Sequence, residues 1–277
     1  MSDVDEELER ARRALEHWRD YPVDADPRRL VLTGETVLVG AGFASNDAKQ
    51  AFLAGEFAAA ADVPDEVLRA LARHHGKLHG HALRITGAER VSATFDTDRG
   101  PRQLPAWRVR IDGVDGPVSV LDPEIARDAA GPEGIDGITG TDMRARLGAD
   151  ERTMILEFLG SPPQYTDYPR AVVLESPAAV TVIPVPHELL EGDRLLYGQQ
   201  REVTARLRDP LGARVAVDYR SGCPITVDAA PAPQHATARE QTAIPGCGLL
   251  SGTHQTRAPR TPATLPALVQ CVDGYQL

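Results

Sequence analysis

Residues 95–123, FDTDRGPRQLPAWRVRIDGVDGPVSVLDP, contain two runs in which apolar and polar side chains alternate. The first run carries Trp107, Val109 and Ile111, and the second carries Val118 and Val120. A Gly-Val-Asp-Gly segment at 113–116 separates them, and such a segment favours a tight turn. The stretch therefore predicts a β-hairpin. It contains no His, no Cys and no nucleophile beside a base, so it predicts structure without predicting chemistry.

The same stretch resembles part of a family of uncharacterised proteins from high-GC actinobacteria of the Streptomyces type. Two further segments share the resemblance, AKQAFLAGEF at 48–57 and REVTARLRDPLGARVAVD at 201–218. The resemblance implies a source and a shared fold. It implies no activity, cofactor or site residue.

The composition predicts a soluble, acidic protein. The chain has 277 residues and a formal net charge of -10, and its basic residues are almost all Arg. Nucleic acids and anionic membranes attract clustered Lys and Arg, so we expect neither as a partner. The first residues, MSDVDEELER, are acidic where a secretion signal would be basic and then apolar, which predicts a cytoplasmic protein. Cys223, Cys247 and Cys271 form no CxxC pair, so we expect neither a disulfide framework nor a structural zinc site.

The pattern of apolar residues predicts an α+β protein in which strands dominate. Residues 1–22 are expected to hold an N-terminal helix, because Leu8, Ala11, Leu15 and Trp18 recur at helical spacing. This helix either packs on its own domain or docks a partner. The predicted divisions that follow are an α+β domain with the hairpin at 28–125, a linker at 126–149, a β-rich domain at 150–228 and a disordered tail at 229–277.

Within the first domain, helices are predicted at about 47–60, capped by Ser45 or Asn46, and at 64–73. The second domain contains short strands between Pro- and Gly-rich turns. This pattern predicts a small antiparallel β-sandwich-like domain. The tail is rich in Ala, Pro, Thr and Gly and shows no apolar period, which is why we expect disorder there.

Two sets of residues are the candidate binding sites. Arg99, Arg102 and Trp107 lie in a stretch with two prolines, and could hold an acidic or planar ligand by bidentate and stacking contacts. The alternative is a rigid strand entry with Trp107 in the core. His75, His79 and His81 belong to the run HHGKLHGH and could bind a metal ion, although Gly76 and Gly80 interrupt any helix that would align them. A solvated connection is the alternative.

Three weaker motifs suggest other chemistry. Gly40-x-Gly42-x-x-Ser45 follows a strand and resembles a dinucleotide fingerprint, with an ordinary glycine turn as the alternative. Residues 96–100, DTDRG, are similar to the start of a calcium loop but lack its later ligands. Cys223 and His187 are a conceivable nucleophile and base, joined by nothing in the sequence.

No catalytic residue and no cofactor is predicted from these patterns. The preferred function is a non-catalytic cytoplasmic binding or protein-interaction protein, whose protein partner is unknown. The alternatives are an enzyme whose active site is assembled only in three dimensions, and a metal-binding protein that uses His74 to His81.

Overall fold

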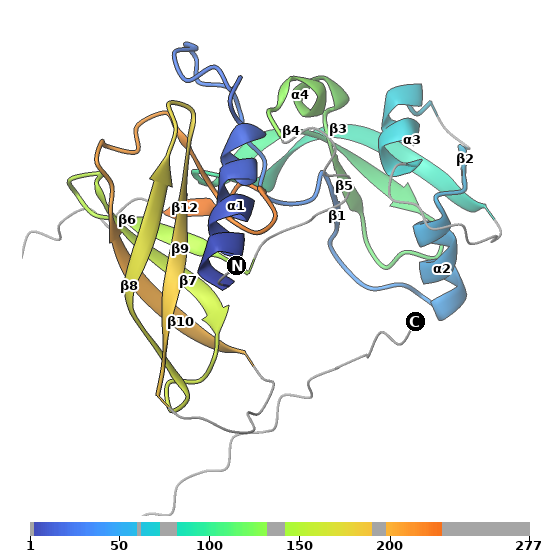
Figure 1. Ribbon diagram of the computed structural model, residues 1–277. Coiled ribbons are helices and arrows are strands. Elements are labelled where there is room, and N and C mark those ends of the chain that lie inside the picture. Colours follow the sequence, from blue (N-terminus) through green and yellow to red (C-terminus); the bar gives the residue numbers. More distant parts are fainter. Residues whose placement is uncertain (1–2, 60–61, 73–81, 132–141, 190–197, 229–277) are drawn as a thin grey trace, which may run out of the picture. The chain divides into compact units, whose positions relative to one another are not determined.

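A computed structural model describes residues 3–59, 62–72, 82–131, 142–189 and 198–228 (Figure 1). All of them belong to one compact unit, Met1–Ala232, which contains both of the predicted domains. The predicted tail at 229–277 and the predicted metal ligands His75, His79 and His81 lie outside the described residues. The described part is a β-dominated α+β structure, as the sequence predicts.

The first half of the chain forms a five-stranded sheet. Its strands, in spatial order, are β1 (Val37–Val39), β5 (Val118–Leu121), β4 (Gly100–Ile111), β3 (Leu83–Thr97) and β2 (Phe57–Ala59). Every pair is antiparallel except β2 with β3. The predicted hairpin is β4 and β5, in which Trp107 lies opposite Val120. Gly113 and Gly116 have φ values of 86° and 92°, which a side chain would strain.

Different elements cover the two faces of this sheet. On one face, Val109 and Ile111 of β4 pack with Phe52 of α2 (Asn46–Ala54) and Leu71 of α3 (Asp65–Ala72). On the other face, Leu104 and Ala106 pack with residues 30–38 and with α4 (Pro123–Asp128). Odd-numbered and even-numbered residues of one strand point to opposite faces, which is why β4 contributes to both clusters.

The caps explain where α2 begins and ends. The Ser45 hydroxyl accepts a hydrogen bond from the Ala48 amide at 3.1 Å, so of the two predicted residues Ser45 is the cap. The helix stops at Ala54, and the prediction that it continues to residue 60 is wrong. Gly55 adopts the left-handed conformation with φ 69°, and its amide bonds to Phe52 O. Glycine favours this helix end, so residues after it are free to form β2.

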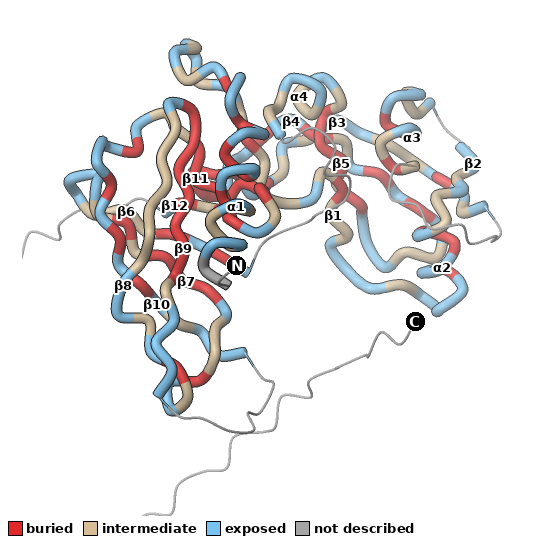
Figure 2. Tube along the Cα trace, viewed as in Figure 1, coloured by how far each residue is buried: buried red, intermediate tan, exposed pale blue. Residues whose placement is uncertain are grey.

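The second half of the chain forms two packed sheets, the sandwich. One has four strands, in the order β10 (Gln199–Arg206), β7 (Thr153–Gly160), β6 (Arg144–Leu147) and β12 (Thr226–Asp228). The other has three, in the order β11 (Val215–Val217), β9 (Ala179–Glu188) and β8 (Thr166–Glu175). Each sheet contains one parallel pair, β12 with β6 and β11 with β9, so both are mixed. Buried residues recur along β7 and β9 (Figure 2), and their apolar side chains share one core.

Helix α1 (Asp3–Glu16) lies against the sandwich (Figure 1). Ala11 belongs to the sandwich core, and Ala14, Leu15 and Trp18 pack with Ala179 and Val215. The Trp18 indole donates a hydrogen bond to Gly222 O at 2.9 Å, across 204 positions of the sequence. The amphipathic face of the helix is therefore buried by the half of the chain that is farther away in sequence.

Polar contacts at the β3–β4 turn join the sheet to the sandwich. Asp98 is 1% exposed and accepts two hydrogen bonds from the Arg28 guanidinium, whose Nε also donates to Ala213 O, in the loop before β11, at 3.0 Å. The Val227 amide of β12 donates to Asp98 O at 3.0 Å. Arg99 donates to Gly212 O and Arg214 O, both at 2.7 Å. The β3–β4 turn is thus bonded to β12 and to the loop before β11.

The segment predicted as a linker, 126–149, carries regular structure at both ends. Helix α4 extends into it as far as Asp128, and β6 occupies Arg144–Leu147. Residues 132–141 lie outside the described part. None of the described helices combines the length and the apolar character that crossing a bilayer requires.

Candidate functional site

The three predicted ligand residues do not converge on one surface. Arg99 donates its hydrogen bonds to the sandwich carbonyl groups described above. Burial is the main reason that the pKa of its guanidinium is lowered. Arg102 lies opposite Phe95, and Trp107 lies opposite Arg90. Arg102 and Trp107 are five positions apart on β4, a distance of roughly 16 Å along the strand. Because this spacing is odd, their side chains point to opposite faces of the sheet. Trp107 is half-buried, with the Arg90 guanidinium 5.1 Å from its ring centroid.

The weaker motifs are occupied by structural contacts. The glycine turn after β1 bonds to the β4–β5 turn, through Asp115 N to Gly42 O at 2.9 Å and Ala44 N to Gly113 O at 3.0 Å. The helix that follows leads to β2, at the opposite edge of the sheet from β1. A dinucleotide site needs a parallel neighbouring strand at that point, so this arrangement is unsuited to one.

The environments of Asp98 and Cys223 also disfavour the chemistry that the sequence suggested for them. The carboxylate of Asp98 is held by Arg28, which leaves it unable to serve as a calcium ligand. Cys223 is 4% exposed, and burial raises the pKa of its thiol, which disfavours the reactive thiolate. His187 lies exposed near the end of β9, opposite Asp167. Within the described residues, no three His, Cys, Asp or Glu side chains are grouped to hold a metal ion.

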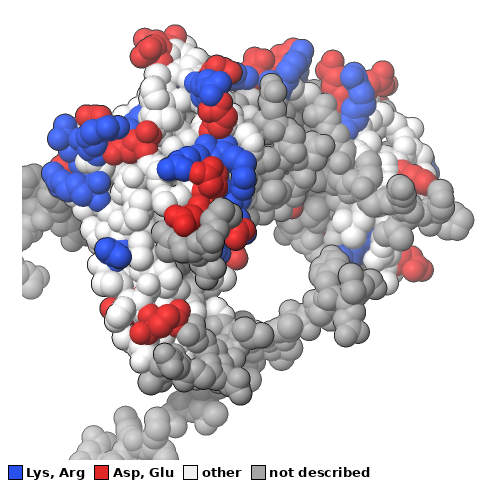
Figure 3. Space-filling model, viewed as in Figure 1, with Lys and Arg blue, Asp and Glu red and all other residues white. Residues whose placement is uncertain are grey.

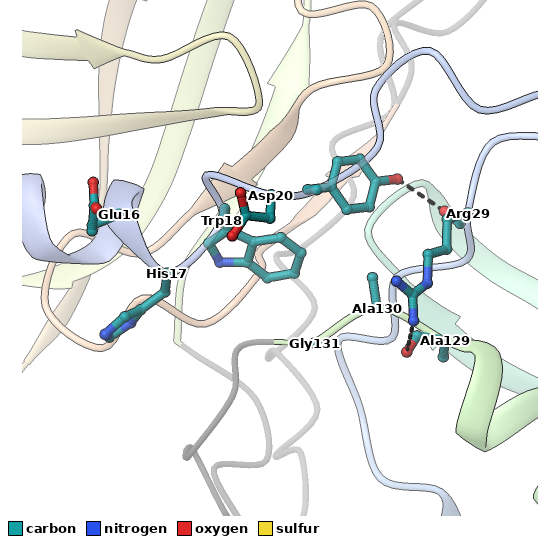
Figure 4. A pocket seen from close by; sticks show the side chains of 9 residues that line it. Glu16, His17, Trp18, Asp20, Arg29, Ala129, Ala130 and Gly131 are labelled. Atoms are coloured by element: carbon teal, nitrogen blue, oxygen red, sulfur yellow. Dashed lines mark hydrogen bonds between the residues drawn. The ribbon is translucent and has the colours of Figure 1, made fainter.

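A pocket lies where α1 ends, and we call it the α1-end pocket. Its volume is about 630 Å³. It is lined by Glu16, His17, Trp18, Asp20, Tyr21, Arg29, Ala129, Ala130 and Gly131. Trp18 and Asp20 lie on one side, and Arg29 and Ala129 lie on the other (Figure 4). The site therefore combines residues that follow α1 with residues that follow α4.

The aromatic side of the α1-end pocket is firmly held. The rings of Trp18 and Tyr21 meet edge to face, with centroids 5.8 Å apart. The Tyr21 hydroxyl donates to Arg29 O at 2.9 Å, and the Arg29 Nε donates to Asp128 O at 2.8 Å. Burial, opposed by Arg28, raises the pKa of Tyr21, so this hydroxyl stays protonated at neutral pH. A pocket with walls fixed in this way is pre-organised to bind a ligand.

A second, smaller pocket shares His17 with the first, and we call it the basic pocket. Its volume is about 130 Å³. The lining consists of Arg10, Arg13, Ala14, His17, Arg220, Ser221 and Gly222. Basic and acidic side chains lie interspersed over α1 (Figure 3), yet the polar side chains that line this pocket are three arginines, one imidazole and one hydroxyl.

Comparison with family models, with curated proteins and with solved structures finds no match to this chain. The actinobacterial resemblance therefore stays a prediction, and the function has to be argued from the site itself. Sequence patterns did not indicate either pocket. The only available signal was the spacing of Arg10, Arg13 and His17, which places the three on one side of a helix.

Proposed function

We propose that this protein is a non-catalytic cytoplasmic binding protein, of the actinobacterial type that its sequence resembles, and that its ligand is a small polar molecule. The observation that carries the proposal is the α1-end pocket. Its volume of about 630 Å³ lies within the range of roughly 300–1,000 Å³ typical of small-molecule sites. Its lining offers aromatic edges, carboxylates and a guanidinium within one concavity.

The arrangement of titratable groups favours binding over catalysis. An activated nucleophile or base is recognised by a hydrogen bond to the side chain that activates or orients it. Glu16 pairs with Arg19, and among the described residues of this pocket Glu16, His17 and Asp20 make no hydrogen bond to one another. The pocket presents these groups separately, as contacts that could orient a ligand.

A thermal-shift screen of the full chain against metabolites, nucleotides and divalent metals tests the proposal. A ligand that binds the folded state raises the melting temperature with its concentration. We expect a saturable rise with a small polar compound, reduced in Asp20→Asn and retained in Asp24→Asn. Asp20 lines the pocket, whereas Asp24 is an exposed acid four residues away that does not.

Three results would contradict the proposal. A compound that binds and is converted to product would favour the enzyme alternative. A shift with zinc that is removed by EDTA and by substitution of His75 and His79 would favour the metal alternative. No shift with any compound would favour a protein-interaction surface as the functional site.

A further inference from the structure

The basic pocket has the size and the donors of an oxyanion site. Arg10, Arg13 and His17 are spaced i, i+3 and i+7, so they lie on the same side of α1 and of the turn that follows it. Arg220 reaches the same pocket from the loop before β12. A water molecule occupies about 30 Å³ in the liquid, so about 130 Å³ accommodates a tetrahedral anion of five heavy atoms.

The loop that carries Arg220 is held rigidly by its own hydrogen bonds. Asp218 accepts hydrogen bonds from the Arg220 amide at 2.9 Å and from the Ser221 hydroxyl at 3.0 Å. The Gly222 amide donates to Asp218 O at 2.8 Å, and Gly222 O accepts from the Trp18 indole at 2.9 Å. The loop is therefore fixed to α1, and the position of Arg220 beside the helix does not depend on a ligand.

Glycine is required at the point where the loop meets the helix. Gly222 has a φ of 75°, and a Cβ there would lie 3.1 Å from Nδ1 of His17. The imidazole thus packs directly against the loop backbone, which closes the pocket on that side.

The carboxylates near the basic pocket lie outside its lining, and Asp218 is occupied by hydrogen bonds from the Arg220 amide and the Ser221 hydroxyl. Arg10 pairs with Glu6, and Arg220 stacks over the Tyr219 ring with its Nη2 3.9 Å from Glu7. The Arg13 side chain makes no hydrogen bond or ion pair with any described residue. Glu6 and Glu7 do not line the pocket. Guanidinium groups hold phosphate through paired, charge-assisted hydrogen bonds, which suits a site formed by several arginines.

We propose that the basic pocket binds a phosphate group, which is either inorganic phosphate or the phosphate of a ligand whose remaining part occupies the α1-end pocket. The second form rests on the proposed function, because it requires a ligand in that neighbouring pocket, and His17 lines both. The first form stands without it.

A purely structural role for these side chains makes a different prediction. Cations near the end of a helix offset the partial negative charge of its last carbonyl groups. If Arg13 and His17 served only this purpose, substituting them would lower the stability of the protein and leave phosphate without any specific effect.

The test titrates the full chain with inorganic phosphate and with a phosphate monoester, glycerol 3-phosphate, at constant ionic strength, by calorimetry and thermal shift. We expect saturable binding that Arg13→Gln and Arg220→Gln each weaken about tenfold, the usual cost of a lost charged hydrogen bond. Arg13→Lys, which keeps the charge but not the fork of donors, should weaken it less. The control is Arg102→Gln, an exposed arginine on β4 outside both pockets, which should bind phosphate like the unsubstituted protein.

The outcomes separate the two pockets. Binding of phosphate that is insensitive to Asp20→Asn supports the anion site even if the screen for a larger ligand fails. Tighter binding of the monoester that Asp20→Asn removes supports the linked form. No saturable binding of either compound, or equal weakening by Arg102→Gln, would overturn the inference. Both substituted arginines are solvent-exposed, so loss of binding in a folded variant reports on the site.

Discussion

In the five-stranded sheet, β3, β4 and β5 pair in sequence order, whereas the sandwich adds distant segments of the chain to its own neighbouring pairs, β6 with β7 and β8 with β9. Helix α1 comes from the N-terminal end, β12 joins β6 in parallel, and β11 joins β9 in parallel. A hairpin can be predicted from its turn residues and alternation, because both are local. A parallel pair needs a long crossover connection that leaves no local pattern. The two regions therefore differ in how much of their pairing the sequence reveals.

The comparison also locates the candidate site. The α1-end pocket and the basic pocket both lie where α1, which belongs to the sandwich, meets other segments. The sheet contributes Arg29, Ala129 and Ala130, from the segments that enter and leave it. Sites between elements that are remote in sequence are therefore the ones that sequence patterns miss.

The largest expected effect separates the two tryptophans of the chain, one in each region. Trp18 is 2% exposed and bonded to Gly222, so Trp18→Ala should lower the free energy of unfolding by about 4 kcal/mol. Trp107 is half-buried on the sheet, and Trp107→Ala should cost about half as much. Urea denaturation followed by far-UV circular dichroism measures both values. Equal costs would contradict the packing of α1 on the sandwich.

The next effect concerns the contact that joins the two regions. Asp98→Ala leaves the half-buried Arg28 guanidinium without its counter-ion, and should destabilise the protein by about 3 kcal/mol. Asp96→Ala, two residues away and exposed, should change stability by less than about 0.5 kcal/mol. Denaturation of both variants under the same conditions makes the comparison. Similar small effects would mean that the β3–β4 turn does not hold the regions together.

A pair of glycines gives a smaller contrast. Gly222→Ala in the sandwich loop meets both a positive φ and the His17 ring, and should cost about 2 kcal/mol. Gly87→Ala in β3 meets no atom within 4 Å of the new Cβ and has no positive φ, so it should be neutral or stabilising by about 0.5 kcal/mol. Thermal unfolding of the two variants decides this. A stable Gly222→Ala protein would show that the loop can move away from α1.

The smallest effect is a titration in the sandwich. Burial is the main reason that the pKa of Tyr219 rises to about 12, with Glu7 adding to the rise and Arg220 opposing it. The unfolded chain releases this proton near pH 10, so its contribution to stability is complete below pH 10 and is lost as the pH rises through about 12. Tyr219→Phe should remove the late step from the ultraviolet titration of tyrosinate. Loss of absorbance from the step near pH 10, with the late step retained, would place Tyr219 in contact with solvent.

Local signals in the sequence predicted several features of the fold correctly. Ser45 caps α2 because its hydroxyl reaches an amide three residues on, and the Gly113 turn closes the hairpin because glycine tolerates a positive φ. The helix end at Gly55 was missed, although a glycine after a periodic segment is a recognised stop signal. Each of these features depends on residues within a few positions of one another.

The candidate site could not be predicted in the same way. The apolar spacing of Leu15 and Trp18 indicates an amphipathic helix but carries no information about the surface that buries it. Arg99 and Trp107 suggested a ligand surface because they are close in sequence, yet Arg99 lies in the β3–β4 turn and bonds to the sandwich, whereas Trp107 lies on β4 beside Arg90. The pockets depend on contacts such as Trp18 with Gly222, which form only after the whole unit has folded.

The most direct test asks whether the two regions unfold together. Trp18→Phe leaves Trp107 as the only tryptophan, which reports on the sheet, and Trp107→Phe leaves Trp18, which reports on the sandwich. For each variant, urea unfolding is followed by tryptophan fluorescence and by far-UV circular dichroism. If Asp98 and Arg28 hold the sheet and the sandwich in one cooperative unit, the two curves coincide in both variants. Separate midpoints in either variant would show that the regions unfold independently, and would contradict the account.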